Sequence, residues 1–186
     1  MRREVLVIAV VAVVAVAGLV LWDGRAGEGS RTALPAVDPA WDPLGPQERC
    51  ERALELVSHP DRWPIRCRWR EAGEGLAGQS FPPPAGAPPY DEPRVEIYVA
   101  RQQPREDVAR TIAHELGHMH HTREPAFVAE WLRARNLPPD TPSEVWTEDY
   151  AEVFAALFGP PSDRWRAPTA RPDVEALAAL KARFFS

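Results

Sequence analysis

Cysteine is scarce in this sequence, and positive charge is not in excess. The 186 residues include only two cysteines, and 22 basic side chains face 27 acidic ones, so the formal net charge is -5. Two cysteines without a third or fourth thiol nearby do not form the usual structural zinc site. A chain with net negative charge and scattered basic residues lacks the basic surface that nucleic acids bind, so we expect no nucleic-acid partner.

One stretch near the N-terminus is long, apolar and free of charge. Residues 5–22 contain no charged side chain, and as a helix these 18 residues would be about 27 Å long, close to the roughly 30 Å hydrocarbon core of a bilayer. Two arginines precede the stretch, whereas the charges that follow it cancel, which predicts a cytoplasmic N-terminus and an extracytoplasmic remainder. We therefore predict a single-pass membrane anchor at residues 1–22. The alternative is a signal peptide cleaved near the small residues at 15–17, which would give a secreted protein.

Two further segments follow the predicted anchor. Residues 23–45 are rich in proline, glycine and alanine without periodicity, a composition that predicts a linker. Residues 46–186 are predicted to form one domain. In the oxidising compartment that export implies, we expect Cys50 and Cys67 to form a disulfide, the alternative being two buried reduced cysteines.

Residues 46–186 contain both strand and helix patterns. Alternating apolar residues predict strands at 65–69 and 94–100, and apolar residues at helical spacing predict helices at 47–58, 104–121, 124–136, 141–158 and 173–185. Residues 141–144 have the form of a capping box. The glycine- and proline-rich stretch at 73–93 is predicted to be irregular. Together these patterns predict an α+β domain with a small sheet.

A His-Glu-Leu-Gly-His motif lies at 114–118, in the second half of a predicted helix. His114 and His118 are four residues apart, so both imidazoles project from one helix face and can share one metal ion. Glu115 lies about 100° around the helix from His114, so it is placed to reach a metal-bound water rather than the metal. Gly117 destabilises a helix interior by about 1 kcal/mol relative to alanine, which predicts that the helix at 141–158 crosses closely there.

Two histidines leave a zinc ion short of ligands, so a third protein ligand must come from elsewhere. The predicted helix at 141–158 carries four acidic candidates: Glu144, Glu148, Asp149 and Glu152. Three of these glutamates lie at four-residue spacing and share one helix face. An acidic stripe of this kind is also typical of a solvated surface, so the spacing leaves both interpretations open.

The strand at 95–99, the motif at 114–118 and the later run Glu-Asp-Tyr-Ala-Glu-Val-Phe at 148–154 resemble the glutamate-type zincin metallopeptidases. The similarity is greatest to the small secreted bacterial branch that includes anthrax lethal factor and the Pro-Pro endopeptidases. It implies a minimal zincin-like domain of the α+β class at residues 46–186, with a small antiparallel sheet and zinc-binding helices, preceded here by one transmembrane helix. It also implies that the strand at 94–100 is a sheet edge that pairs with an extended peptide.

The same resemblance assigns roles to individual residues. It implies that His114, His118 and Glu148 are the ligands of Zn2+ and that Glu115 is the general base. It implies that the Glu152 carboxylate orients one of the ligands.

The function that follows is a membrane-anchored, extracytoplasmic zinc metallopeptidase that hydrolyses peptide bonds in a peptide or protein substrate. The related enzymes carry a tyrosine seven residues before the ligand glutamate, and Thr141 stands at that position here. This departure keeps an alternative open: a non-catalytic, zinc-containing surface-binding module. A third interpretation is an accidental motif in a structural envelope protein, which predicts no bound zinc.

Overall fold

The computed structural model describes residues 40–59, 63–71, 73–82, 93–121 and 124–185. The predicted anchor at 1–22 and most of the predicted linker at 23–45 lie outside the described residues. Within the described residues, no helix is both long enough and apolar enough to cross a membrane. The end of the predicted linker contacts the domain, because the Trp41 side chain is buried and its indole N–H donates to the Gln103 carbonyl at 3.0 Å.

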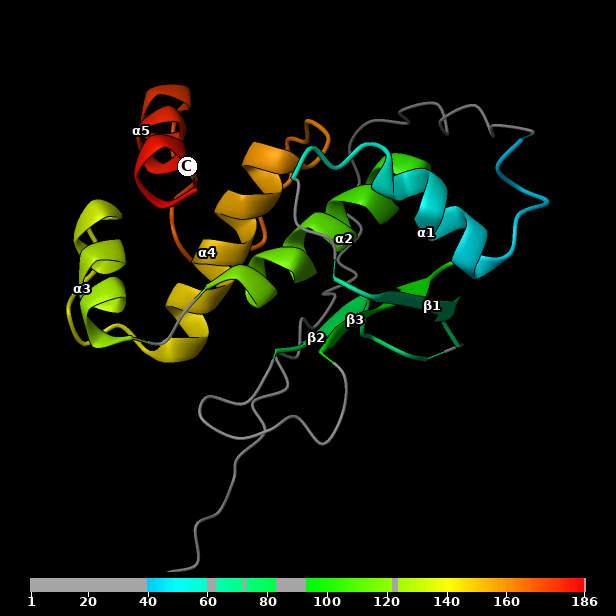
Figure 1. Ribbon diagram of the computed structural model, residues 1–186, viewed down its shortest axis with the longest axis horizontal. Coiled ribbons are helices and arrows are strands. Elements are labelled where there is room, and N and C mark those ends of the chain that lie inside the picture. Colours follow the sequence, from blue (N-terminus) through cyan, green and yellow to red (C-terminus); the bar gives the residue numbers. More distant parts are fainter. Residues whose placement is uncertain (1–39, 60–62, 72, 83–92, 122–123, 186) are drawn as a thin grey trace, which may run out of the picture.

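The described chain forms a mixed α+β fold (Figure 1). Its elements in order are α1 (Pro46–Leu54), β1 (Ile65–Trp69), β2 (Gly78–Phe81), β3 (Arg94–Val99), α2 (Arg105–His120), α3 (Pro125–Ala134), α4 (Ser143–Phe158) and α5 (Val174–Phe184). Every helix and strand predicted from periodicity is confirmed, with ends that differ by at most a few residues. Strand β2 lies inside the stretch at 73–93 that was predicted to be irregular.

The three strands form a mixed sheet in the order β1-β3-β2. Strand β1 pairs with β3 in parallel, with Ile65 opposite Val95, whereas β2 pairs with β3 antiparallel, with Gly78 opposite Ile97. The prediction of an antiparallel sheet is therefore wrong for one of the two pairs. The chain reverses direction after β1 and again after β2, so β3 regains the direction of β1 and then lies between the other two strands.

The central place of β3 also corrects the prediction that residues 94–100 form a sheet edge. Both sides of β3 are paired within the sheet, so its backbone has no open row for a peptide. The edges are β1 and β2. Alternation along β3 is as predicted, because Val95, Ile97 and Val99 are fully buried against the helices.

Two apolar clusters hold the helices. The first cluster lies between the sheet, α1, α2 and the end of α4, and the second lies between α3, α4 and α5. In Figure 1 the sheet with α1 and α2 forms one end of the molecule, and α3 and α5 lie at the other end beyond α4. Helix α4 belongs to both clusters and crosses α2, so these two helices form the centre of the fold.

The crossing of α2 and α4 is close because Gly117 faces α4 without a side chain. A Cβ atom at Gly117 would lie 2.7 Å from the Cα atom of Ala151 and 3.0 Å from the Cβ atom of Phe154. These distances are shorter than van der Waals contact, so no larger residue fits without moving a helix. The prediction of a close crossing at Gly117 is confirmed.

The start of α4 differs from its prediction. Pro142 occupies the N-cap position and no side chain caps the helix. Thr141 lies one residue before the N-cap, and its hydroxyl donates to the Pro138 carbonyl at 2.6 Å instead of capping. The predicted capping box at 141–144 is therefore wrong by this one-residue shift.

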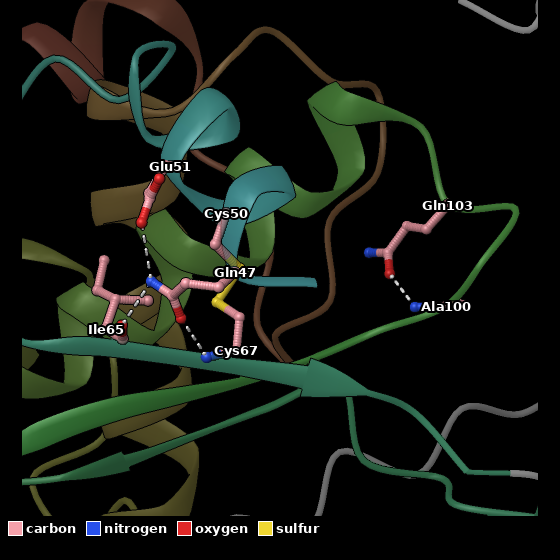
Figure 2. Close-up of a disulfide and its surroundings, with 7 residues drawn as sticks. All are labelled: Gln47, Cys50, Glu51, Ile65, Cys67, Ala100 and Gln103. Atoms are coloured by element: carbon pink, nitrogen blue, oxygen red, sulfur yellow. Dashed lines mark hydrogen bonds between the residues drawn. A yellow bond between two sulfur atoms is a disulfide. The ribbon is translucent and has the colours of Figure 1, made fainter. Parts of the chain in front are cut away.

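The predicted disulfide between Cys50 and Cys67 is present and joins α1 to β1 (Figure 2). Beside it, the Gln47 side chain accepts a hydrogen bond from the Cys67 N–H at 3.0 Å and donates to the Ile65 carbonyl at 3.3 Å. These are backbone groups on the outer side of β1, where no further strand pairs. The disulfide and the Gln47 amide together close that edge of the sheet against another strand.

Replacing both cysteines by alanine should lower the free energy of unfolding by about 3 kcal/mol, because the bridge closes a loop of 17 residues in the unfolded chain. Urea unfolding of the full chain, followed by tryptophan fluorescence, measures the change. Wild-type protein with a reductant is the control and should unfold at the urea concentration that unfolds the double variant. An unchanged midpoint in both samples would contradict a stabilising bridge.

Candidate metal centre

The crossing at Gly117 brings the motif on α2 against the acidic residues of α4. His114 and His118 lie on the face of α2 that meets α4, and Glu148 lies one turn before Ala151 on α4. The closest backbone approach is therefore one turn from the side chains that gather. A short helix-to-helix distance is what allows two imidazoles and a carboxylate from different helices to converge.

Three side chains converge closely enough to hold a metal ion. Their ligand atoms all lie within 4.8 Å of one another: Nε2 of His114, Nε2 of His118 and the Glu148 carboxylate. Each histidine Nε2 atom is 3.3 Å from a Glu148 oxygen, and the two Nε2 atoms are 3.2 Å apart. His114 is buried, whereas His118 and Glu148 are half-buried, so the group is open to solvent on one side. The predicted set of three candidate ligands is thus brought together.

A buried ion pair fixes the orientation of His114. The Nδ1 atom of His114 lies 3.0 Å from one oxygen of Glu152, and Arg110 donates to the other oxygen at 2.8 Å. A carboxylate only accepts hydrogen bonds, so Nδ1 carries a proton toward Glu152, and Nε2 is the ring atom of His114 that faces Glu148. Arg110 and Glu152 are almost fully buried. The predicted place of Glu152, behind a candidate ligand, agrees with this geometry.

The charges in the group interact strongly. Burial lowers the pKa of His114, but its hydrogen bonds with the Glu148 and Glu152 carboxylates outweigh burial and raise the pKa to about 10. Burial raises the pKa of Glu148, but hydrogen bonds with His114 and His118 bring the pKa well below its ordinary value. Both shifts favour a positive charge between the imidazoles and the carboxylates. A divalent cation bound between these groups would supply the same positive charge, and it would replace the proton shared by His114 and Glu148.

Glu115 stands beside this group without belonging to it. The side chain is 6% exposed, and burial raises the pKa of its carboxyl above the ordinary value, although His114 and His118 oppose that shift. Among the described residues, none hydrogen-bonds to its carboxylate. Gly78 of β2 lies directly against it, because a Cβ atom there would be 2.7 Å from Cγ and 2.8 Å from Oε1 of Glu115. The carboxylate is thus held between β2 and α2 with its proton-accepting capacity unused.

The other acidic candidates on α4 lie elsewhere. Asp149 is fully buried and accepts hydrogen bonds from Trp131 at 3.2 Å and from Arg135 at 2.8 Å, and Thr169 contacts its other side. These donors occupy its carboxylate and tie α4 to α3. Glu144 is exposed near the start of α4. Of the four candidates, Glu148 alone therefore contacts both histidines, and Glu152 contacts His114 from behind.

No tyrosine of the described residues reaches the group. The Tyr150 hydroxyl is 2.8 Å from Nδ1 of His120 inside the second apolar cluster, and burial raises the pKa of this tyrosine. Tyr98 lies on the face of the sheet turned away from α2, with its ring under Arg68 at 4.2 Å. Thr141 is bonded to the turn at Pro138. These three residues are thus engaged in packing and turns.

Comparisons with known protein families, with curated proteins and with solved structures find no match to this chain. The resemblance to the zincin metallopeptidases therefore rests on the motif and on the geometry of its residues. It remains a prediction.

Sequence reasoning missed two residues at this centre. Arg110 precedes His114 by four residues and so lies on the same helix face, a spacing that could have shown it as a partner for the acid behind His114. Gly78 gave no such signal, because its contact with Glu115 depends on how β2 pairs with β3.

Glu148→Ala should release bound Zn2+ during dialysis, because it removes one of only three converging ligands. Glu152→Ala should keep the metal with an affinity lowered about 10- to 100-fold, because it frees the His114 ring without removing a ligand. Zinc content after dialysis, measured by mass spectrometry, separates the two. Glu144→Ala is the matched control and should behave like wild type. If Glu152→Ala loses its zinc on dialysis and Glu148→Ala keeps it, Glu152 rather than Glu148 is the ligand.

Proposed function

We propose that this chain is a membrane-anchored, extracytoplasmic zinc metallopeptidase that hydrolyses peptide bonds. One observation carries the proposal. Three potential ligands from two helices converge within 4.8 Å, and beside them lies the buried carboxylate of Glu115, to which no described residue hydrogen-bonds. Metal ligands together with an adjacent base are the parts that hydrolysis by an activated water requires.

The donor set fits zinc. Two imidazole nitrogens and one carboxylate oxygen are typical ligands of catalytic zinc, which keeps its fourth position for water. Bound by His114, His118 and Glu148, zinc would polarise the scissile carbonyl and lower the pKa of water. The half-buried state of His118 and Glu148 supports the proposal, because substrate and water must enter from one side.

Glu115 acts as the general base in this proposal. It accepts the proton of the attacking water at its carboxylate and passes that proton to the leaving amine. The raised pKa of its carboxyl, caused by burial, brings it closer to the neutral range in which both transfers occur. Glu152 and Arg110 hold the His114 ring so that its Nε2 stays directed at the metal.

Strand β2 is the edge best placed to receive an extended peptide. The Gln47 amide occupies the outer side of β1, so the remaining edge of the described sheet is β2. In the antiparallel register with β3, the Tyr98 N–H donates to the Ala77 carbonyl, so the backbone groups of Gly78 and Ser80 point to the open side. A peptide added there would lie beside Glu115, which Gly78 contacts.

The extracytoplasmic location rests on the sequence and on the disulfide. The apolar stretch at 5–22 predicts the anchor, and the bridge between Cys50 and Cys67 supports an oxidising compartment.

Glu115→Gln should abolish peptide cleavage while leaving bound zinc and the unfolding midpoint unchanged, because the amide keeps the shape but cannot accept the proton. The full chain is incubated with a peptide library, with and without a chelator, and products are read by mass spectrometry. Cleavage by wild type that stops with chelator is the expected baseline. Loss of zinc in Glu115→Gln would instead make Glu115 a ligand or a structural residue.

The alternative function is a zinc-containing module that binds without cleaving. It is favoured by Thr141, because the zincin metallopeptidases that this chain resembles carry a tyrosine at that position. It is also favoured by Tyr98 and Tyr150, whose side chains contact Arg68 and His120 rather than the candidate metal ligands. Wild-type protein that binds zinc and cleaves no peptide of the library would support this module and exclude the peptidase.

Gly78→Ala should lower the rate of cleavage at least about tenfold, because a 2.7 Å contact forces the Glu115 side chain out of place. Zinc content should stay at the wild-type value, since no ligand is touched. Gly75→Ala, at a position with nothing within 4 Å, is the matched control and should cleave like wild type. Equal rates for the two variants would show that Gly78 does not position the base.

A further inference from the structure

A pocket of about 280 Å3 opens next to Glu115, toward the start of α2. Thr111 and Asp107, one and two turns before Glu115 on α2, form one wall. Ala77, which precedes Gly78 at the start of β2, also lines the pocket. The pocket therefore lies beyond the start of β2, where a peptide along that strand would extend.

The lining of this pocket is positively charged. Arg70 enters from the end of β1, and Arg164 and Arg166 enter from the segment that follows α4. The one acidic residue in the lining is Asp107, which pairs with Arg164 at 3.1 Å. The charged residues of the lining are thus three arginines and one aspartate. Pro104 and Asp107 also place the N-terminus of α2, the positive end of the helix dipole, in the wall.

Arg166 is the cation with unused donors. Its side chain is half-buried, and loss of solvent lowers the pKa of its guanidinium. No described residue forms a hydrogen bond or an ion pair with that guanidinium. The backbone N–H of Arg166 bonds to Glu152, which fixes the residue next to the candidate metal centre. A partly desolvated guanidinium with five N–H donors and no acceptor is a binding group for a planar anion.

The charge of Arg166 acts on the proposed catalytic residues directly. It lowers the pKa of the Glu115 carboxyl, against the larger raising effect of burial. The Glu152 and Asp107 carboxylates in turn act on Arg166. Asp107 in the lining, and Glu115 and Glu152 near Arg166, would repel a doubly charged phosphate more strongly than a singly charged group. The balance of charges therefore favours a carboxylate as the ligand.

We propose that this pocket binds a carboxylate of the substrate, with Arg166 as the principal donor and Arg70 as a second cation. The inference rests on the proposed function, because it makes the pocket a specificity site of the same cleft. The carboxylate has two sources, an acidic side chain near the scissile bond or a free C-terminus. A pocket of this volume holds one such group and leaves the rest of the peptide along β2.

Binding of four short peptides to the full chain tests the proposal without requiring cleavage. Acetyl-Ala-Ala-Glu-Ala-Ala-amide carries only a side-chain carboxylate, and acetyl-penta-alanine with a free C-terminus carries only a terminal one. Their neutral counterparts are acetyl-Ala-Ala-Gln-Ala-Ala-amide and acetyl-penta-alanine amide. Affinities are measured by calorimetry on protein as purified and after metal removal with a chelator. The chelated sample excludes coordination of the carboxylate to zinc.

At least one carboxylate probe should bind about tenfold or more tightly than its neutral counterpart in both samples, since charge-assisted hydrogen bonds to a guanidinium are strong. The probe that shows the preference identifies the source. Arg166→Gln should reduce the preference to about threefold or less, and Arg166→Lys should retain part of it because the charge remains. Arg171→Gln, an exposed arginine outside the pocket, is the matched control and should leave the preference unchanged.

Equal affinities for charged and neutral probes would overturn the proposal, as would a preference that Arg166→Gln leaves intact. If Arg166→Gln does not fold, as judged by circular dichroism, Arg70→Gln takes its place and should lower the preference about threefold. The outcome is separate from that of the peptidase proposal. A preference for carboxylate probes without cleavage of the peptide library would support the carboxylate pocket and contradict the peptidase proposal. Cleavage of the library without such a preference would support the peptidase and contradict the pocket.

Discussion

The contact of α2 with α4 at Gly117 is the constraint on which the candidate site depends. With only a hydrogen atom at Gly117, the Ala151 backbone approaches to a distance that any side chain would prevent. That approach brings His114 and His118 into contact with Glu148, whose side chain is short relative to the spacing of ordinary packed helices. The two apolar clusters on either side of α4 hold the crossing in place. A glycine that weakens its own helix is thus what permits the three side chains to converge.

Burial of charge decides which acidic residues of α4 are satisfied within the protein and which one can bind a metal ion. A buried carboxylate is tolerated only when a cation or several donors accompany it, because removal from water costs several kcal/mol per ion. Asp149 has Arg135 and Trp131, and Glu152 has Arg110 and His114, so both are satisfied within the protein. Glu148 is left half-buried, with the two histidines as its partners. The acid that is least satisfied by the fold is therefore the one available to a metal ion.

The sheet is closed on one side and open on the other. A disulfide and a side-chain amide occupy the β1 side, where they hold α1 in place. The β2 side carries Gly78 against Glu115, and Ala77 before β2 lines the arginine-lined pocket together with Arg70 after β1. The open strand, the unbonded carboxylate and the three metal-ligand candidates of the described molecule thus lie on the same side of the sheet as β2. The opposite edge serves stability.

The sequence by itself determined the helices, two of the three strands, the disulfide pair and the motif at 114–118, because each follows from local periodicity or from residue identity. It also indicated the close crossing at Gly117, since a glycine inside a helix needs a reason. Only the tertiary structure decided that β2 is a strand and that β3 is central. Glu148 was expected from the resemblance to the zincins, and the packing of α4 on α2 brings it to both histidines. The contacts of Gly78 and Arg166 were likewise hidden, whereas the four-residue spacing of Arg110 and His114 already places both on one helix face. Local patterns specify which face of an element is apolar, whereas pairing between distant segments depends on how those faces pack together.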